Sequence, residues 1–370
     1  MSAKNVLGII FSNAYDEVLP QLTALRTMGS VPFAGRYRLI DFPLSNMVNA
    51  GISKVGVITK SNYRSLMDHI GTGKPWDLSR KREGMTLLPP FSFANLGVPA
   101  GKADALYGSI SYISDSNKDY VLLTDCNIIC NMDYEDMIKA HIAKNADITL
   151  AYAKGVPPMI PDACEFELGE NGRVLSDTLI ECYTGEANYS LKTMIIGRTL
   201  LERLLHEAHS ARIDDFETIL GNNVNHLNVY GYEVKGYVKV LESLQSYYDA
   251  SMEILKSENR KQLFVAERPF LTKVRDQVPA FYGMESKVSN SLIADGCKIE
   301  GEVENSILFR GVTVAKGAKV KNAIIMQDSF VGENASVESV ILDKKVIVKP
   351  GKKLCGDSSY PVYVGKGIVI

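Results

Sequence analysis

The sequence has 370 residues, of which 46% are hydrophobic and 23% charged, and its formal net charge is −2 at pH 7. One hydrophobic core rarely spans this length, so two domains are expected, and the weak charge gives no reason to expect nucleic acid or a membrane surface as a partner. No apolar run reaches the ~18 residues that cross a bilayer, and the first residues lack the apolar segment of a signal peptide, so we expect a cytoplasmic protein.

Patterns typical of strands and of helices alternate through residues 1–245. Short apolar runs predict buried strands at residues 6–11, 55–58, 120–125 and 148–152. Helical patterns occupy residues 41–51, which end at a glycine, 103–113 and 134–143. This alternation predicts an α/β domain of Rossmann-like type, with a mixed and mostly parallel sheet.

Six cysteines in a chain of this length do not make a disulfide framework. Cys126 and Cys130 have a C-x3-C spacing that a metal site would allow. They sit on an apolar strand and its exit, and no second pair of Cys or His follows nearby. We therefore interpret them as buried free thiols.

Residues 246–285 are helical and then polar, with Pro269 and Pro279, and are interpreted as a linker. From residue 286 to 370 apolar residues recur every six positions, at Ile293, Ile299, Val314, Val320, Met326, Val331, Val337, Leu342 and Val348. Such hexads predict a parallel β-helix, whose coils are stable only as a stack. An ordinary antiparallel sheet is the alternative, but alternation of period two is weak here.

Several segments resemble one enzyme family. Residues 31–52 read VPFAGRYRLIDFPLSNMVNAGI, 290–299 read NSLIADGCKI, and 305–312 read NSILFRGV; GKADAL at 101–106 and NMDY at 131–134 follow the same order. These segments are similar to glucose-1-phosphate adenylyltransferases, also called ADP-glucose pyrophosphorylases. The resemblance implies a nucleotidyltransferase domain followed by a left-handed β-helix, and a part in bacterial glycogen biosynthesis. The reaction of the family joins ATP and glucose-1-phosphate into ADP-glucose and releases pyrophosphate.

This chemistry needs a glycine-rich loop and cations for the phosphates, and carboxylates for Mg²⁺. The family's glycine-rich loop aligns with residues 13–19, NAYDEVL, which contain no glycine and two acids, Asp16 and Glu17. Its arginine position falls on Val18 and the following lysine on Met28. Two acids beside a triphosphate would repel it.

The metal-binding aspartates of the family fall on Asn127 and Val240, and its sugar-phosphate lysine has no clear counterpart in residues 178–182. Asp125 is a weak candidate metal ligand, because residues two apart on a strand point the same way; a cap is the alternative role. Glu242 is near Val240 but out of register.

Some motif positions are retained. Gly101, Asp104 and Ala105 are the remnant of the nucleotide pocket, although Asp104 fits a helix N-terminus equally well. Arg36 and Arg38 lie where basic residues of the family are near an effector site between the domains, and the alternative for them is a solvated or salt-bridged loop.

The chain therefore resembles the GlgD-type subunits of the family, which are found beside catalytic GlgC-type subunits. We predict a regulatory subunit, non-catalytic or weakly catalytic, which binds no cofactor of its own while Mg²⁺ serves the catalytic partner. We expect a heterotetramer, or a homo-oligomer of the chain alone, and a sugar-phosphate or nucleotide effector. One alternative is an active, divergent adenylyltransferase with Asp125 or Glu242 at the metal. Another is a uridylyltransferase with an acyltransferase β-helix, which the absence of histidine from residues 286–370 disfavours.

Overall fold

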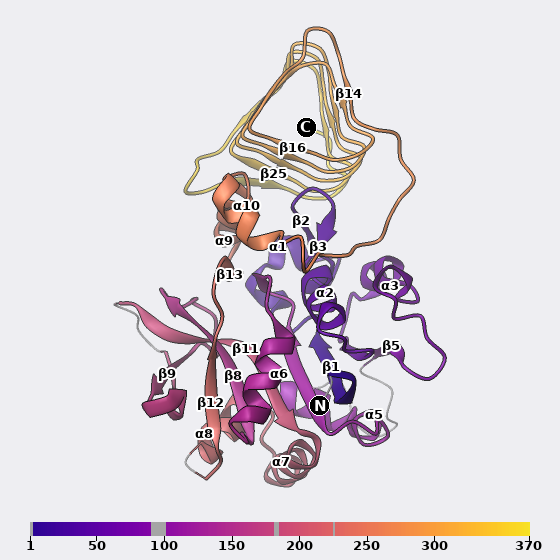
Figure 1. Ribbon diagram of the computed structural model, residues 1–370. Coiled ribbons are helices and arrows are strands. Elements are labelled where there is room, and N and C mark those ends of the chain that lie inside the picture. Colours follow the sequence, from indigo (N-terminus) through magenta and orange to yellow (C-terminus); the bar gives the residue numbers. More distant parts are fainter. Residues whose placement is uncertain (1–2, 90–100, 181–184, 225) are drawn as a thin grey trace.

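The structure is a computed structural model that describes residues 3–89, 101–180, 185–224 and 226–370. An α/β domain carries a β-helix, which appears end-on as a triangle in Figure 1. Two helices and a short hairpin of the α/β domain face the base of this triangle. No helix in the described residues is both long enough and apolar enough to cross a bilayer.

The α/β domain is built on a nine-stranded sheet, in which β12 and β8 branch from the path β10-β9-β11-β6-β1-β4-β5. Strands β6, β1, β4 and β5 are parallel, and β11 runs antiparallel to β6. The strands are β1 (Val6–Phe11), β4 (Lys54–Ile58), β5 (Gly84–Leu88), β6 (Tyr120–Asp125), β8 (Ile148–Gly155), β9 (Cys164–Leu168), β10 (Val174–Leu179), β11 (Ala187–Gly197) and β12 (Val229–Glu233).

Helices cover both faces of this sheet, so its central strands β1, β4 and β6 are buried on both sides. One face packs against α2 (Asp41–Asn49), α3 (Arg64–Ile70), α6 (Tyr134–Ala143) and α9 (Leu244–Glu253). The other packs against α4 (Lys102–Tyr107), α5 (Ile110–Ser114), α7 (Arg198–Ala211) and α8 (Phe216–Asn223). Two further short helices are α1 (Pro20–Thr23) and α10 (Ser257–Leu263), and two strand pairs are β2 (Pro32–Phe33) with β3 (Tyr37–Arg38) and β7 (Ile128–Cys130) with β13 (Val238–Val240).

The predicted mixed sheet is confirmed, with two local differences. The helix expected at 103–113 is divided into α4 and α5 at Gly108 and Ser109. Glycine is a weak helix former, and the Ser109 hydroxyl donates to the carbonyl of Ala105 at 3.1 Å, which competes with the regular helix pattern. Strand β8 continues to Gly155 because it pairs with β11 beyond the apolar run. Cys126 and Cys130 are buried free thiols, as predicted.

The predicted β-helix is also confirmed, as three parallel five-stranded sheets. Its strands are β14 (Phe281–Tyr282), β17 (Lys298–Ile299), β20 (Thr313–Val314), β23 (Phe330–Val331) and β26 (Ile347–Val348); β15 (Lys287–Ser289), β18 (Glu302–Glu304), β21 (Lys319–Lys321), β24 (Ser336–Glu338) and β27 (Lys353–Cys355); and β16 (Leu292–Ile293), β19 (Ile307–Leu308), β22 (Ile324–Ile325), β25 (Val340–Leu342) and β28 (Val362–Val364). The predicted hexad positions are buried, apart from the half-buried Ile293, and fill the prism with stacked aliphatic rows.

Buried polar contacts join the two domains. The Arg26 guanidinium binds both carboxylate oxygens of Asp343 at 2.8 and 2.6 Å, and both side chains are almost fully buried. From α9, the Tyr248 hydroxyl donates to the Asn322 carbonyl of the β-helix at 2.7 Å. These contacts hold the β-helix against α9 and the chain after α1, and within the α/β domain the Tyr247 hydroxyl donates to the Pro32 carbonyl of β2 at 2.6 Å.

Candidate functional site

A cavity of about 370 Å³ opens where the carboxyl ends of β1 and β4 meet the start of α4. Ligands bind at such strand ends in open α/β sheets. The loop after β1 supplies Tyr15, Glu17 and Val18, and α4 supplies Lys102 and Ala105 to the wall. We call this cavity the nucleotide-type pocket.

In the loop after β1, an acid binds the backbone at the position of the family's lysine. The Asp16 carboxylate accepts a hydrogen bond from the Met28 backbone N–H at 2.6 Å. Met28 is uncharged and fully buried, so the family's lysine position supplies no cation for phosphate here. Burial raises the pKa of Asp16 to about 7, which places a negative charge beside the pocket above that pH.

The two positions that match the family's metal-binding aspartates lie side by side. The Asn127 carbonyl accepts from the Leu241 N–H at 2.8 Å, and Val240 pairs with Ile128 between β13 and β7. Both side chains are buried. Neither amide atom of Asn127 has a hydrogen-bond partner among the described residues, so this side chain is a buried polar group without compensation.

Asp125 is the last residue of β6 and is buried behind Lys102, which lines the pocket and neutralises it. Its Oδ2 atom is 2.7 Å from Lys102 Nζ. The same Nζ atom is 3.1 Å from the Tyr15 hydroxyl and 3.7 Å from Asp162 Oδ2. Burial raises the pKa of Asp125 to about 6, which Lys102 offsets only in part, so the carboxyl is ionised at neutral pH.

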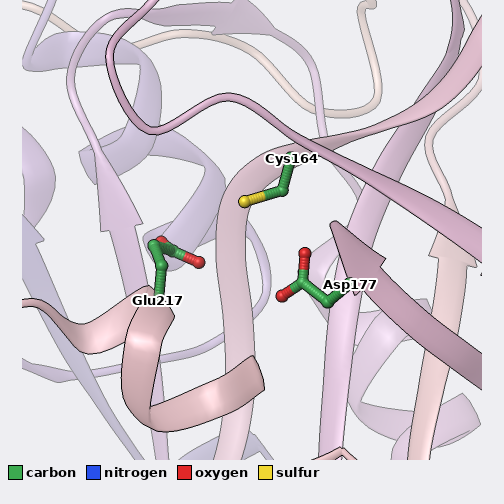
Figure 2. A group of neighbouring side chains, drawn as sticks. All are labelled: Cys164, Asp177 and Glu217. Atoms are coloured by element: carbon green, nitrogen blue, oxygen red, sulfur yellow. The ribbon is translucent and has the colours of Figure 1, made fainter. Parts of the chain in front are cut away.

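A second lysine continues this network into the cluster drawn in Figure 2. The Cys164 thiol and the carboxylates of Asp177 and Glu217 face one another there, with potential ligand atoms within 4.8 Å. The Lys192 Nζ atom is 3.1 Å from Glu217, 3.5 Å from the Cys164 sulfur and 3.7 Å from Asp162. The ammonium group of Lys192 therefore already supplies a positive charge at this cluster.

Glu242, the other acid near the family's second metal position, is engaged by backbone. Its carboxylate accepts a hydrogen bond from the Met159 N–H. The next residue, Ser243, caps α9 in a capping box with Ser246. Glu242 thus lies at the helix start and not in the floor of the pocket.

The residues at the family's metal positions do not fit Mg²⁺. This ion requires carboxylate or other oxygen ligands that are free to bind it. Asn127 and Val240 supply no carboxylate, and Asp125 is held by Lys102. We therefore derive no metal-dependent step for this chain.

The remnant of the nucleotide motif begins α4. A Cβ atom at Gly101 would lie 2.2 Å from the Asp214 carbonyl, so the position requires glycine. Gly101 and Ala105 line the pocket, whereas Asp104 lies in the first turn of α4 and is not part of the lining. Residues 181 and 182, from the segment compared with the sugar-phosphate lysine motif, lie outside the described part of the chain.

A second cavity, of about 110 Å³, lies between the two domains. Six basic side chains line it, together with His69, Gln327 and Asp328: Arg36, Arg38, Lys273, Arg275, Arg310 and Lys344. We call it the cationic pocket. The pKa of Lys344 is lowered to about 7, mainly by burial and further by the positive charges of Arg38 and Arg26.

Arg36 and Arg38 reach this pocket from the β2–β3 hairpin. Gly35, at the hairpin turn, has a φ of +78° and lies against the β-helix near Leu308. The Arg38 guanidinium donates to the Ser65 carbonyl at 2.6 Å, and Arg36 lies over the Tyr37 ring at 5.8 Å. The structure thus places both predicted arginines at the interdomain cavity.

Sequence reasoning missed most of the charged residues of both sites. One corner of successive coils carries Arg310, Gln327 and Lys344. This register follows from two backbone hydrogen bonds: the Asp328 N–H donates to the Arg310 carbonyl, and the Lys345 N–H donates to the Gln327 carbonyl. The coil register could have revealed this column. Lys102, Lys192 and Asp162 gave no comparable signal, because they come from segments far apart in the sequence.

Comparisons with known proteins agree with this architecture. A nucleotidyl transferase family model matches residues 8–159, and a model of the GlmU-like C-terminal hexapeptide region matches residues 278–360. The β-helix nevertheless contains no histidine.

The chain is similar to curated proteins over its whole length. It is 36% identical to the glycogen biosynthesis protein GlgD of Bacillus subtilis (strain 168), across 100% of this chain and 98% of that protein. It is 38% identical to GlgD of Geobacillus stearothermophilus, across 98% of this chain and 97% of that protein. It is 33% identical to a glucose-1-phosphate adenylyltransferase of Clostridium perfringens (strain SM101 / Type A), across 100% of this chain and 97% of that protein.

Proposed function

We propose that this chain, which belongs to the glucose-1-phosphate adenylyltransferase family of glycogen biosynthesis, is a regulatory subunit and not a catalytic one. One observation carries the proposal: Asn127 and Val240 stand at the family's two metal positions and supply no carboxylate, while the nearby acid Asp125 is bound to Lys102. The loop after β1 adds Asp16 and Glu17 in place of glycines. A site with this charge arrangement disfavours a metal–triphosphate complex.

The cationic pocket supports a regulatory role. The lining combines six basic side chains with the carboxylate of Asp328. Its excess of positive charge suits a ligand with several negative charges. The pocket is bordered by both domains, so an anion bound there contacts both. We propose a sugar-phosphate or nucleotide effector, sensed in part by Arg36 and Arg38.

The proposed partner is a catalytic, GlgC-type homologue, in a heterotetramer. The outer face of the β-helix offers it an apolar ladder, in which Phe330 pairs with Ile347 and Ile347 with Val369. These side chains are 37%, 41% and 52% exposed. Contacts across this face would shift the equilibrium of the partner toward its active state, with a coupling free energy of about 1–3 kcal/mol.

The first experiment measures ADP-glucose formation by the purified chain with ATP, glucose-1-phosphate and Mg²⁺. We expect little or no product, because each missing group costs about 10²-fold or more in rate. A turnover near ~10 s⁻¹, typical of enzymes, would contradict the proposal and favour a divergent active enzyme.

The second experiment mixes the chain with a purified catalytic homologue. We expect a larger particle by light scattering and a changed kcat or KM of the partner. The variants Phe330→Asp and Ile347→Asp should weaken assembly, whereas Leu25→Asp, at an exposed apolar residue of the α/β domain, should not. Unchanged mass and kinetics in the mixture would rule out the regulatory role.

The third experiment adds a hexose bisphosphate or AMP to the mixture. Arg36→Ala and Arg38→Ala should reduce the effector response, and Arg203→Ala, on the exposed surface of α7, should leave it unchanged. A response that both pocket variants retain would remove these arginines from the mechanism while leaving the assembly intact.

A further inference from the structure

Lys102 is the first residue of α4, and its side chain ends in the floor of the nucleotide-type pocket. Its Nζ atom is surrounded by oxygen atoms from three segments of the chain. They are Asp125 Oδ2 at 2.7 Å, the Tyr15 hydroxyl at 3.1 Å and Asp162 Oδ2 at 3.7 Å. The two carboxylates are ligands that hard divalent cations also bind, and the Tyr15 hydroxyl donates to Asp162 Oδ2 at 2.7 Å.

Two further oxygen atoms at this place have no hydrogen-bond partner among the described residues. They are the second carboxylate oxygens, Oδ1, of Asp125 and of Asp162. Asp125 is 1% exposed, so water does not compensate this side chain. The two acids therefore offer more acceptor atoms than the single ammonium group uses.

The charges require a cation here. Uncompensated carboxylates in a buried place are strongly disfavoured, and removing the partner of a buried ion pair leaves such a charge behind. Lys192 lies at the other end of the network, where it forms ion pairs with Asp162 and Glu217 and lies near Cys164. Lys102 is therefore the cation that neutralises Asp125.

We propose that the ammonium group of Lys102 is a built-in cation that occupies a latent site for a hard divalent cation, formed by Asp125 and Asp162. The protein then excludes the metal while Lys102 is present, and removal of the lysine side chain opens the site. This inference deepens the proposed function, because it gives a physical reason for the loss of metal-dependent chemistry.

The test uses the full chain and Mn²⁺ as the probe. Mn²⁺ binding is followed by electron paramagnetic resonance and calorimetry. Wild-type protein should show no saturable binding at millimolar Mn²⁺, and Lys102→Ala should bind one ion with a dissociation constant of about 0.1–1 mM. Mn²⁺ should also raise the Tm of Lys102→Ala and leave that of wild type unchanged, since a ligand of the folded state stabilises it.

Three further variants define the site. Lys60→Ala removes an exposed lysine from the same pocket and should bind no Mn²⁺. Lys102→Arg keeps the positive charge and should also exclude the ion. Asp125→Asn added to Lys102→Ala should abolish the binding that Lys102→Ala gained.

Saturable Mn²⁺ binding by wild type at the affinity of Lys102→Ala, or none by folded Lys102→Ala, overturns the proposal. If Lys102→Ala is unfolded without metal, refolding by Mn²⁺ supports the proposal and failure to refold in Mn²⁺ overturns it. Co-assembly of wild type with the catalytic homologue is measured separately, so the proposed function stands or falls on a different result.

Discussion

Asp16 is a half-buried acid that accepts a hydrogen bond from the Met28 backbone, and its partial burial raises its pKa to about 7. The folded state therefore binds a proton that the unfolded state, with an ordinary pKa near 3.8, releases. By linkage, its contribution to stability is least favourable above pH 7 and improves as the pH falls toward 4.

We expect Asp16→Asn to raise the free energy of unfolding on the order of 1 kcal/mol at pH 8, because asparagine still accepts from the Met28 N–H without a charge. At pH 5 the two proteins should differ little. Urea denaturation at both pH values checks this. A gain of equal size at pH 5 and pH 8 would show that charge is not the cause.

Asn127 and Asn131 are both buried, and they differ in their partners. Asn131 donates to the carbonyls of Leu263 and Arg268, each at 2.9 Å, whereas the Asn127 amide has no partner among the described residues. Asn127→Leu should therefore be neutral or stabilising, and Asn131→Leu should cost about 2 kcal/mol. Thermal unfolding of both variants measures the difference.

The same comparison predicts the effect of restoring an acid. Asn127→Asp places a buried carboxylate where the amide finds no partner, and should destabilise the protein by about 3 kcal/mol at pH 7. The loss should shrink at pH 5, where the carboxyl becomes protonated. A variant as stable as wild type at pH 7 would mean that a cation compensates position 127.

At the scale of elements, the Arg26–Asp343 pair connects the chain after α1 to a corner of the β-helix. Both side chains are almost fully buried, and Tyr363 also donates to Asp343 at 3.0 Å. Arg26→Met leaves the carboxylate buried without its cation and should cost about 3–5 kcal/mol. Arg203→Met, in the exposed pair with Glu207, should cost less than about 1 kcal/mol. Equal losses in chemical denaturation would contradict the burial argument.

The elements themselves were largely predictable from the sequence. Strands β1 and β6 and helix α6 begin and end where the apolar patterns do, because burial on the sheet sets the pattern. The break between α4 and α5 was missed, since the apolar face from Leu106 to Ile113 continues across Gly108. Periodicity reports which face is buried and not whether the backbone hydrogen bonds are continuous.

The candidate sites were predictable only in part. Motif positions identified Arg36 and Arg38, and also Asn127 and Val240, because the family resemblance fixes their places in the sequence. The network around Asp125 was not predictable: Lys102 binds Asp125, and Tyr15 and Asp162 contact Lys102, only in the folded chain. Ion pairs between distant segments leave no periodic signal.

At the scale of the whole molecule, the positive charge of the cationic pocket, which both domains line, depends on pH. Burial lowers the pKa of Lys344 to about 7, so this side chain loses its charge as the pH rises through 7. His69 also faces the pocket, and burial lowers its pKa below the ordinary histidine value. Anion binding should therefore weaken between about pH 6 and pH 8.

Sulfate is a suitable probe, because it does not titrate in this range. We expect sulfate to raise the Tm more at pH 6 than at pH 8, since a bound anion stabilises the folded state. Lys344→Met should reduce the sulfate effect at pH 6 and remove most of its pH dependence, whereas Lys139→Met, on the exposed face of α6, should change neither. A sulfate effect independent of pH in wild type would exclude Lys344 as the titrating group.

The column of corner residues in the β-helix has a geometric consequence. Arg310, Gln327 and Lys344 belong to successive coils, and neighbouring parallel strands lie about 4.8 Å apart. The two cations of the column therefore originate two steps, or about 10 Å, apart along the prism axis. The spacing of the coils thus sets the separation of the anionic groups that this column can bind. Moving one basic residue to the equivalent position of a neighbouring coil would change that separation by one step, without altering the fold.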